Sequence, residues 1–191
     1  ANQRVRNAGT IGGNLAFAEP HADPPAFLIA AEAGLQLEGP EGTRYAPVEG
    51  WLAGAFDTDI REGEVLHSVW LELPEPRMAF GYRRFKALER PSVSAAVRLV
   101  AGEDGRLASA RIVLGCLGGA PIVVRGTDDI LAGVALDALD GVATDVAAAV
   151  AEEAETVTDP HGPEDYKRHL AGVLAVRALR DAAATLRADG V

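Results

Sequence analysis

The stretch that decides the fold lies near the start of the chain, where residues 5–16 read VRNAGTIGGNLA. The adjacent glycines Gly12 and Gly13 let a backbone approach a ligand closely, because no Cβ intervenes. Thr10 and Asn14 flank them with a hydroxyl and an amide, and main-chain N–H groups in such a loop can hold phosphate or carbonyl oxygens. The pattern indicates either a ligand-binding loop or a plain turn between two elements. It is not the GxGxxG of a Rossmann domain, and it lacks the lysine of a Walker loop.

The residues that follow predict a short helix and then a hairpin. Asp23 can cap a helix over residues 24–33, whose first turn takes two prolines and which stops at Gly34. Strands are expected at residues 35–38 and 44–48, around a Gly-Pro-Glu-Gly turn. A further strand over residues 63–73 is closed by the Pro-Glu-Pro break at 74–76.

Beyond residue 76 the pattern changes to longer strands followed by helices. Strands are predicted at residues 81–86, 93–100 and 107–117, the last two joined by the turn 102–105. Helices are predicted at residues 128–132, at 136–154, and from Pro163 onward, where acidic residues in the first turn suit the helix dipole. The sequence therefore predicts an α+β chain in two parts, residues 1–76 and 77–191.

Composition excludes several classes of protein. The 191 residues carry a formal net charge of −10, which argues against non-specific nucleic-acid binding. No apolar run approaches the ~18–20 residues of a membrane span. The single cysteine, Cys116, rules out an internal disulfide, a cysteine-based zinc site and a four-cysteine iron–sulfur cluster within this chain, and we expect it to be a buried apolar residue. His161 beside Asp159 is better explained as part of a polar loop than as a metal site.

Taken together, the motifs resemble a known family, the FAD-binding medium subunits of molybdenum hydroxylases such as xanthine dehydrogenase, aldehyde oxidoreductase and aerobic carbon monoxide dehydrogenase. The resemblance covers nearly the whole chain, in order. It rests on residues 5–16 with Pro20-x-x-Asp23, GEVL at 63–66, Phe85-Lys86 with Arg90, residues 112–119 with Pro121, and Tyr166-Lys167-Arg168.

The resemblance implies the fold class and the domains. Residues 1–76 would be the second subdomain of a PCMH-type FAD-binding domain, and residues 77–191 a C-terminal domain like that of the carbon monoxide dehydrogenase flavoprotein, with helices packed on an antiparallel sheet. The family's first subdomain, whose glycine-rich loop holds the FAD pyrophosphate, has no counterpart here, so the chain corresponds to the C-terminal two-thirds of such a subunit. It also departs from the family at Glu19, where aspartate is common, and at Val93 and Ser94, where an acidic residue is expected.

The resemblance also implies site residues, all of them for FAD and none for a metal. Asp23 would lie near the flavin or its ribityl chain, Leu66 would pack on the adenine or ring region, and Lys86 would lie near the isoalloxazine, where a cation favours the anionic reduced flavin. The remaining residues would line the FAD or, for Gly12, set the loop: Val5, Gly9, Thr10, Gly12, Gly13 and Asn14. None of them acts as a nucleophile or general base, since the cofactor carries the chemistry.

The implied function is electron transfer within a cytoplasmic hetero-oligomer. A large subunit with a molybdopterin cofactor would hydroxylate the substrate, and two [2Fe–2S] clusters in a small subunit would pass the electrons to FAD in this subunit and on to an external acceptor. Two other hypotheses remain open, namely another PCMH-type FAD oxidoreductase and a flavin-free interaction module derived from the family. Plainer interpretations also stand, in which Asp23 is only a helix cap, Lys86 only a solvated strand charge, and Trp51 and Trp70 only packing residues.

Overall fold

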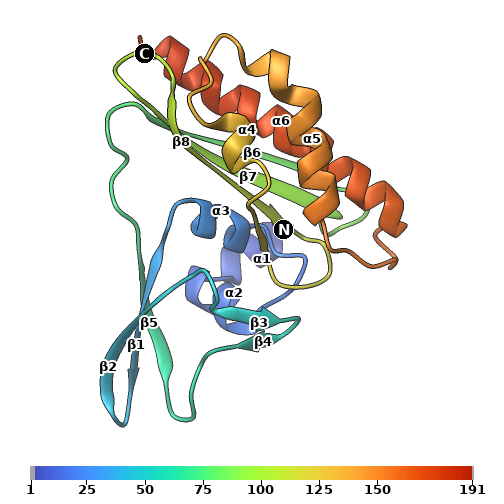
Figure 1. The fold of residues 1–191 in the computed structure, drawn as a ribbon. Coiled ribbons are helices and arrows are strands. Elements are labelled where there is room, and N and C mark those ends of the chain that lie inside the picture. The colour runs from blue at the N-terminus through green and yellow to red at the C-terminus, as the bar shows by residue number, and fades with distance from the viewer. Residues whose placement is uncertain (1–2, 191) are drawn as a thin grey trace.

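The computed structural model describes residues 3–190, so that residues 1, 2 and 191 of the two expected parts lie outside the described residues. The chain begins with three short helices, α1 (Gln3–Ala8), α2 (Ile11–Phe17) and α3 (Pro24–Ala30). A three-stranded antiparallel sheet in the order β2-β1-β5 follows, made of β1 (Gly34–Gly39), β2 (Gly42–Pro47) and β5 (Val65–Trp70). A small pair, β3 (Leu52–Gly54) and β4 (Asp57–Thr58), lies beside α2 (Figure 1).

The second half of the chain is a four-stranded antiparallel sheet in the order β6-β7-β8-β9. Its strands are β6 (Met78–Phe85), β7 (Val93–Ala101), β8 (Leu107–Gly115) and β9 (Ile122–Val124). The helices that follow are α4 (Asp128–Leu131), α5 (Leu139–Glu153) and the long α6 (Glu164–Ala188). Figure 1 shows α5 and α6 covering one face of this sheet, with α3 against the other. The α+β class and the antiparallel sheet packed with helices are confirmed.

The large sheet is shared by two hydrophobic cores, because side chains alternate across a strand. Val97 on β7 and its partner Ile112 on β8 face α6 and belong to a core that includes the buried face of that helix. Ala96 and its partner Val113 face the opposite way, into a core built around α2, α3 and β1. The first half of the chain is therefore packed on one face of this sheet, and helices α5 and α6 of the second half are packed on the other.

Several expectations about the first helices are corrected. The Gly12–Gly13 segment is not a loop but the first turn of α2, because Thr10 caps the helix. Asp23 precedes α3 without a capping hydrogen bond, since its backbone is in the αR region (φ −69°, ψ −44°) rather than the extended one that a cap requires. The helix also ends at Ala30 instead of continuing to residue 33, because Glu32 (φ 53°) takes the left-handed conformation and its N–H bonds to the carbonyl of Ile29.

Two further boundaries differ from the expectation. The strand predicted over residues 63–73 ends at Trp70, because its pairing with β1 ends there, where Trp70 lies opposite Gly34, the first residue of β1. The helices α1 and α2 and the short strands β3, β4 and β9 were not predicted. The hairpin, the three long strands and the last three helices are confirmed within a few residues. Within the described part of the chain, no helix is long and apolar enough to cross a membrane.

Candidate functional site

The start of the sequence forms two short helices, α1 and α2, joined by a tight turn. The backbone of Thr10 is extended (φ −115°, ψ 157°), and its Oγ1 accepts a hydrogen bond from Gly13 N–H at 2.9 Å. The N–H of Asn14 donates to the Thr10 carbonyl at 3.0 Å, and left-handed Ala18 closes the helix by donating to the Asn14 carbonyl at 3.2 Å. Thr10 thereby satisfies one of the free N–H groups of the first turn, which is the ordinary work of a helix cap.

This unit presents an uncovered face. All six residues of α1 are exposed, and Val5 and Ile11 show 54% and 48% of their surface to solvent. The side of α2 that is packed is anchored by Leu15, whose carbonyl accepts a hydrogen bond from the indole of the buried Trp51 at 3.0 Å. A surface helix normally buries an apolar stripe, so α1 with no buried residue indicates a face that a ligand or another protein surface would cover.

Asn14 is the clearest sign of an incomplete site. Its side-chain Oδ1 is buried and has no hydrogen-bond partner within the described part of the chain. A buried acceptor without a partner costs about 1–3 kcal/mol. A group that donates a hydrogen bond at this position would remove that cost.

The structure brings seven of the nine predicted residues together. Gly9 N–H donates to the Val5 carbonyl at 2.7 Å, and a Cβ on Gly9 would lie 2.8 Å from the same oxygen, so only glycine fits there without displacement. Gly12 faces β5, where a Cβ would meet the side chain of Leu66 at 3.9 Å. The seven are Val5, Gly9, Thr10, Gly12, Gly13, Asn14 and Leu66.

The other two predicted residues are related to β6: Asp23 contacts side chains of this strand, and Lys86 follows it in the chain. The hydroxyl of Tyr82 donates to Asp23 Oδ1 at 2.6 Å, and Arg84 forms an ion pair with the same carboxylate. Burial, followed by the hydrogen bond to Asp23, raises the pKa of Tyr82, which therefore stays a neutral donor. Lys86 is exposed directly after the end of β6. Sequence reasoning missed Tyr82 and Arg84, although their i, i+2 spacing on a predicted strand puts them on one face.

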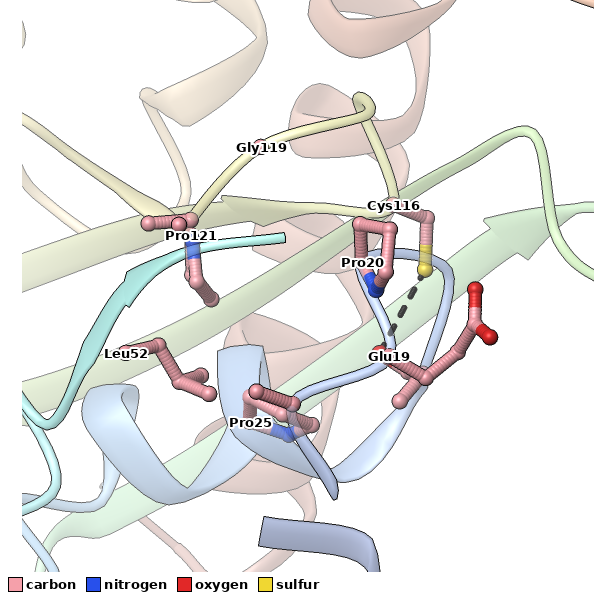
Figure 2. A pocket seen from close by; sticks show the side chains of 11 residues that line it. Glu19, Pro20, Pro25, Leu52, Cys116, Gly119 and Pro121 are labelled. Carbon is pink, nitrogen blue, oxygen red and sulfur yellow. Dashed lines mark hydrogen bonds between the residues drawn. The ribbon is translucent and has the colours of Figure 1, made fainter. Parts of the chain in front are cut away.

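The segment between α2 and α3 adds contacts that were also missed. Glu19, which is largely buried, forms an ion pair with Arg90 at 2.7 Å. Next to it is a small pocket where this segment meets the loop after β8 (Figure 2). Its volume is about 10 Å³, room for one water molecule at most and not for a flavin.

Cys116 lies on the wall of this pocket, and it behaves as a structural residue. Its sulfur lies 3.5 Å from the carbonyl of Ala22, the contact drawn as a dashed line in Figure 2. Burial raises the pKa of the thiol to about 12, so the residue is an inert buried side chain, as expected. Among residues 3–190 no cluster of three or more histidine, cysteine or acidic side chains could hold a metal ion.

The α+β fold, its shared antiparallel sheet and the exposed TIGGN helix occur in a chain that matches the models of two flavoprotein families of the molybdopterin dehydrogenases. Residues 1–76 match the family described as the FAD binding domain in molybdopterin dehydrogenase, and residues 80–182 match the CO dehydrogenase flavoprotein C-terminal domain. The chain belongs to this family of FAD-binding medium subunits of molybdenum hydroxylases, which confirms the resemblance drawn from its motifs.

Individual relatives support the same family. The chain is 32% identical to the carbon monoxide dehydrogenase medium chain of Afipia carboxidovorans, over 96% of this chain and 64% of that protein. It is 33% identical to the corresponding chain of Hydrogenophaga pseudoflava, over 95% of this chain and 63% of the relative. A structure of reconstituted CO dehydrogenase from Oligotropha carboxidovorans superposes with a TM-score of 0.88 at 31% identity, over 96% of this chain and 64% of that one. The chain thus spans somewhat less than two thirds of the length of these relatives.

Proposed function

We propose that this chain forms part of the FAD site of a molybdenum hydroxylase and takes part in passing electrons from [2Fe–2S] clusters of a small partner subunit, through FAD, to an external acceptor. FAD supplies the redox chemistry when bound, and a large partner subunit with a molybdopterin cofactor would be the source of the electrons. Membership of the family supports this proposal, since its relatives are named as dehydrogenase subunits. We also propose domain boundaries at residues 1–76 and 77–191, and a cytoplasmic location to be tested by fractionation.

The proposal rests on the composition of the uncovered face of α1 and α2. It combines exposed apolar side chains at Val5 and Ile11 with the unpartnered amide oxygen of Asn14. A flavin nucleotide has both an apolar ring surface and N–H and O–H donors, so these residues fit the group. Residues Val5, Gly9, Thr10, Gly12, Gly13, Asn14 and Leu66 would hold it, with the amide oxygen of Asn14 accepting a hydrogen bond.

Asp23 and Lys86 would act at the reactive end of the cofactor. The Lys86 ammonium is exposed and would stabilise the negative charge of a reduced ring placed beside it. Asp23, held by Tyr82 and Arg84, is fixed in place and would orient a polar group of the cofactor. These two roles are positional and electrostatic.

The proposal is tested first by the absorption spectrum of the chain, purified alone and with its co-purifying partners. Bands near about 370 and 450 nm, expected of oxidised flavin, would support the redox role. Bands that require the partners would indicate that another chain completes the site. A colourless protein under both conditions would contradict the proposal and favour a flavin-free interaction module.

A paired substitution then tests the Asn14 oxygen. In Asn14→Leu we expect FAD affinity, measured by quenching of flavin fluorescence, to fall about tenfold, the equivalent of about 1.4 kcal/mol. The stability of the FAD-free chain should be unchanged or higher, because the variant removes a buried oxygen without a partner. Asn7→Leu is the matched control, since the Asn7 oxygen already accepts a hydrogen bond from Gln3 at 2.7 Å on the exposed face of α1. Equal losses of affinity in both variants would refute a specific role for Asn14.

A further inference from the structure

A buried charged network joins the start of α6 to the segment between α2 and α3. Lys167, on the first turn of α6, is completely buried, and its Nζ lies 2.6 Å from Asp159 Oδ1. The same ammonium donates to the carbonyl of Val157 at 3.0 Å. Asp159 also accepts a hydrogen bond from the backbone N–H of His161 at 2.8 Å. A fully buried ammonium persists only with such partners, so this loop is held rigidly to α6.

His21 joins this network to two other segments. The residue is 8% exposed, and its ring nitrogen Nδ1 lies 3.0 Å from the carbonyl oxygen of Pro91. A carbonyl can only accept, so Nδ1 carries the proton and donates. The other nitrogen, Nε2, lies 3.4 Å from Asp159 Oδ2, and the His161 ring lies against that of His21, tilted by 38°, with centroids 4.1 Å apart.

The carbonyl of Pro91 belongs to the connection between β6 and β7, residues 86–92, which carries Lys86 at its start. The connection is closed at its base by a hydrogen bond from Ser92 N–H to the Phe85 carbonyl at 2.9 Å. Two side chains from the segment between α2 and α3 hold the rest of it, Glu19 through Arg90 and His21 through Pro91. The Glu19–Arg90 pair is partly solvated, with the arginine side chain 56% exposed, whereas the contact of His21 is buried. Buried contacts are the stronger constraint, because water does not compete for them.

We infer that His21, braced by Asp159 and Lys167, is a positioning residue that holds the connection bearing Lys86 in place. The consequence for flavin, that Lys86 is thereby fixed beside the ring, rests on the proposed function. The network itself is buried and acts through the backbone of residue 91. It therefore couples the loop before α6 to the connection that carries Lys86.

Cleavage by a lysine-specific endoprotease tests this inference without any cofactor. The chain contains two lysines, Lys86 and Lys167, and the second is completely buried. The rate of cleavage after Lys86 in the native chain therefore reports how often the 86–92 connection opens. We expect His21→Ala to raise this rate at least fivefold. His21→Asn, whose amide can still donate to the Pro91 carbonyl, should restore it to within about twofold of the parent.

Two further variants separate positioning from a general loss of stability. Lys167→Met removes the ammonium that pairs with Asp159 and should also accelerate cleavage after Lys86. Leu186→Ala, a core substitution at the opposite end of α6 from Lys167, lowers stability away from the network and should leave the rate unchanged under native conditions. An unchanged rate in both His21→Ala and Lys167→Met, or an equal rise in Leu186→Ala, would overturn the inference.

The link between His21 and flavin is tested in the complex as it is isolated with its partners. If Lys86 is fixed beside the ring, His21→Ala should lower the flavin reduction potential and His21→Asn should return it to the parent value. An unaltered potential despite faster cleavage would overturn the link to flavin. Absence of FAD from the parent complex would overturn the proposed function, and the cleavage rates would still decide whether His21 positions the connection.

Discussion

Thr10 and Asn14 lie four residues apart, and the same α-helical turn assigns them opposite roles. The Thr10 hydroxyl oxygen already accepts a hydrogen bond from the Gly13 N–H, so it supports the helix and has less capacity left to accept a hydrogen bond from a ligand. The Asn14 amide oxygen is brought by one turn of helix to a buried position without a partner. Sequence alone ranks the two residues equally, because both are short polar side chains beside glycine. The helix therefore makes Asn14 the better test of ligand binding.

His21 makes the free energy of unfolding depend on pH in the range just below pH 6.5. Burial, followed by the nearby His161, lowers the pKa of His21 below 6.5, and the opposing effects of the Pro91 carbonyl and Asp159 are smaller. Between the folded pKa and 6.5 the unfolded chain binds more protons, so the free energy of unfolding falls as the pH drops through this range. We expect urea denaturation to show lower stability at about pH 5.5 than at about pH 7.5.

The control for this prediction is His21→Asn, in which the slope over that range should flatten. The neighbouring Asp159 acts in a different window. Burial raises its pKa, but the hydrogen bonds from Lys167 and the His161 N–H outweigh this and lower it below 3.8. Its contribution is present above pH 3.8 and is lost only as the pH falls through the folded pKa. A slope near pH 6 that is the same in parent and variant would show that His21 is not its source.

At the scale of elements, the approach of α6 to β6 depends on one glycine. A Cβ on Gly81 would lie 1.9 Å from the carbonyl oxygen of Ala178, and backbone atoms cannot move aside as a flexible side chain would. We expect Gly81→Ala to lower the free energy of unfolding by about 3 kcal/mol, the upper range for overpacking. Gly54→Ala is the matched control, because nothing lies within 4 Å of its Cβ position and its φ is not positive. Urea denaturation of both variants measures the difference, and similar values would contradict a close contact at Gly81.

The placement of Gly12 and Gly13 in a helix, where a loop was expected, is also explained at the scale of elements. Two adjacent glycines disfavour a helix by roughly 1 kcal/mol each relative to alanine, so local propensity argues for a loop. The structure overrides this because Thr10 caps the helix, Ala18 terminates it, and Leu15 is buried with its carbonyl bound to Trp51. These contacts come from residues as distant as 36 positions, which no local pattern contains.

At the scale of the whole molecule, the two halves of the chain should unfold together. Both tryptophans, Trp51 and Trp70, lie before residue 77, whereas the longest helices, α5 and α6, lie after it. Because Ala96 and Val113 of the large sheet contribute to the first core, loss of the sheet removes one wall of both cores. We expect the urea transitions followed by tryptophan fluorescence and by far-ultraviolet circular dichroism to coincide. A fluorescence transition at clearly lower urea would show that the halves are independent.

The sequence by itself determined the α+β class, the order of the long strands and helices, and the family, because alternation, helix periodicity and motifs are local or ordered along the chain. It also indicated the α1–α2 stretch as the candidate site, and the roles of the individual site residues stay predictions. The tertiary structure alone decided that Gly12 and Gly13 lie in a helix, that Asp23 binds Tyr82 and Arg84 instead of capping, and that the large sheet is shared by two cores. It alone also placed Lys167 and His21, 146 positions apart in sequence, on one carboxylate. The physical reason is common to all of these: each depends on contacts between distant segments, whose free energy exceeds the local preferences that a sequence pattern records.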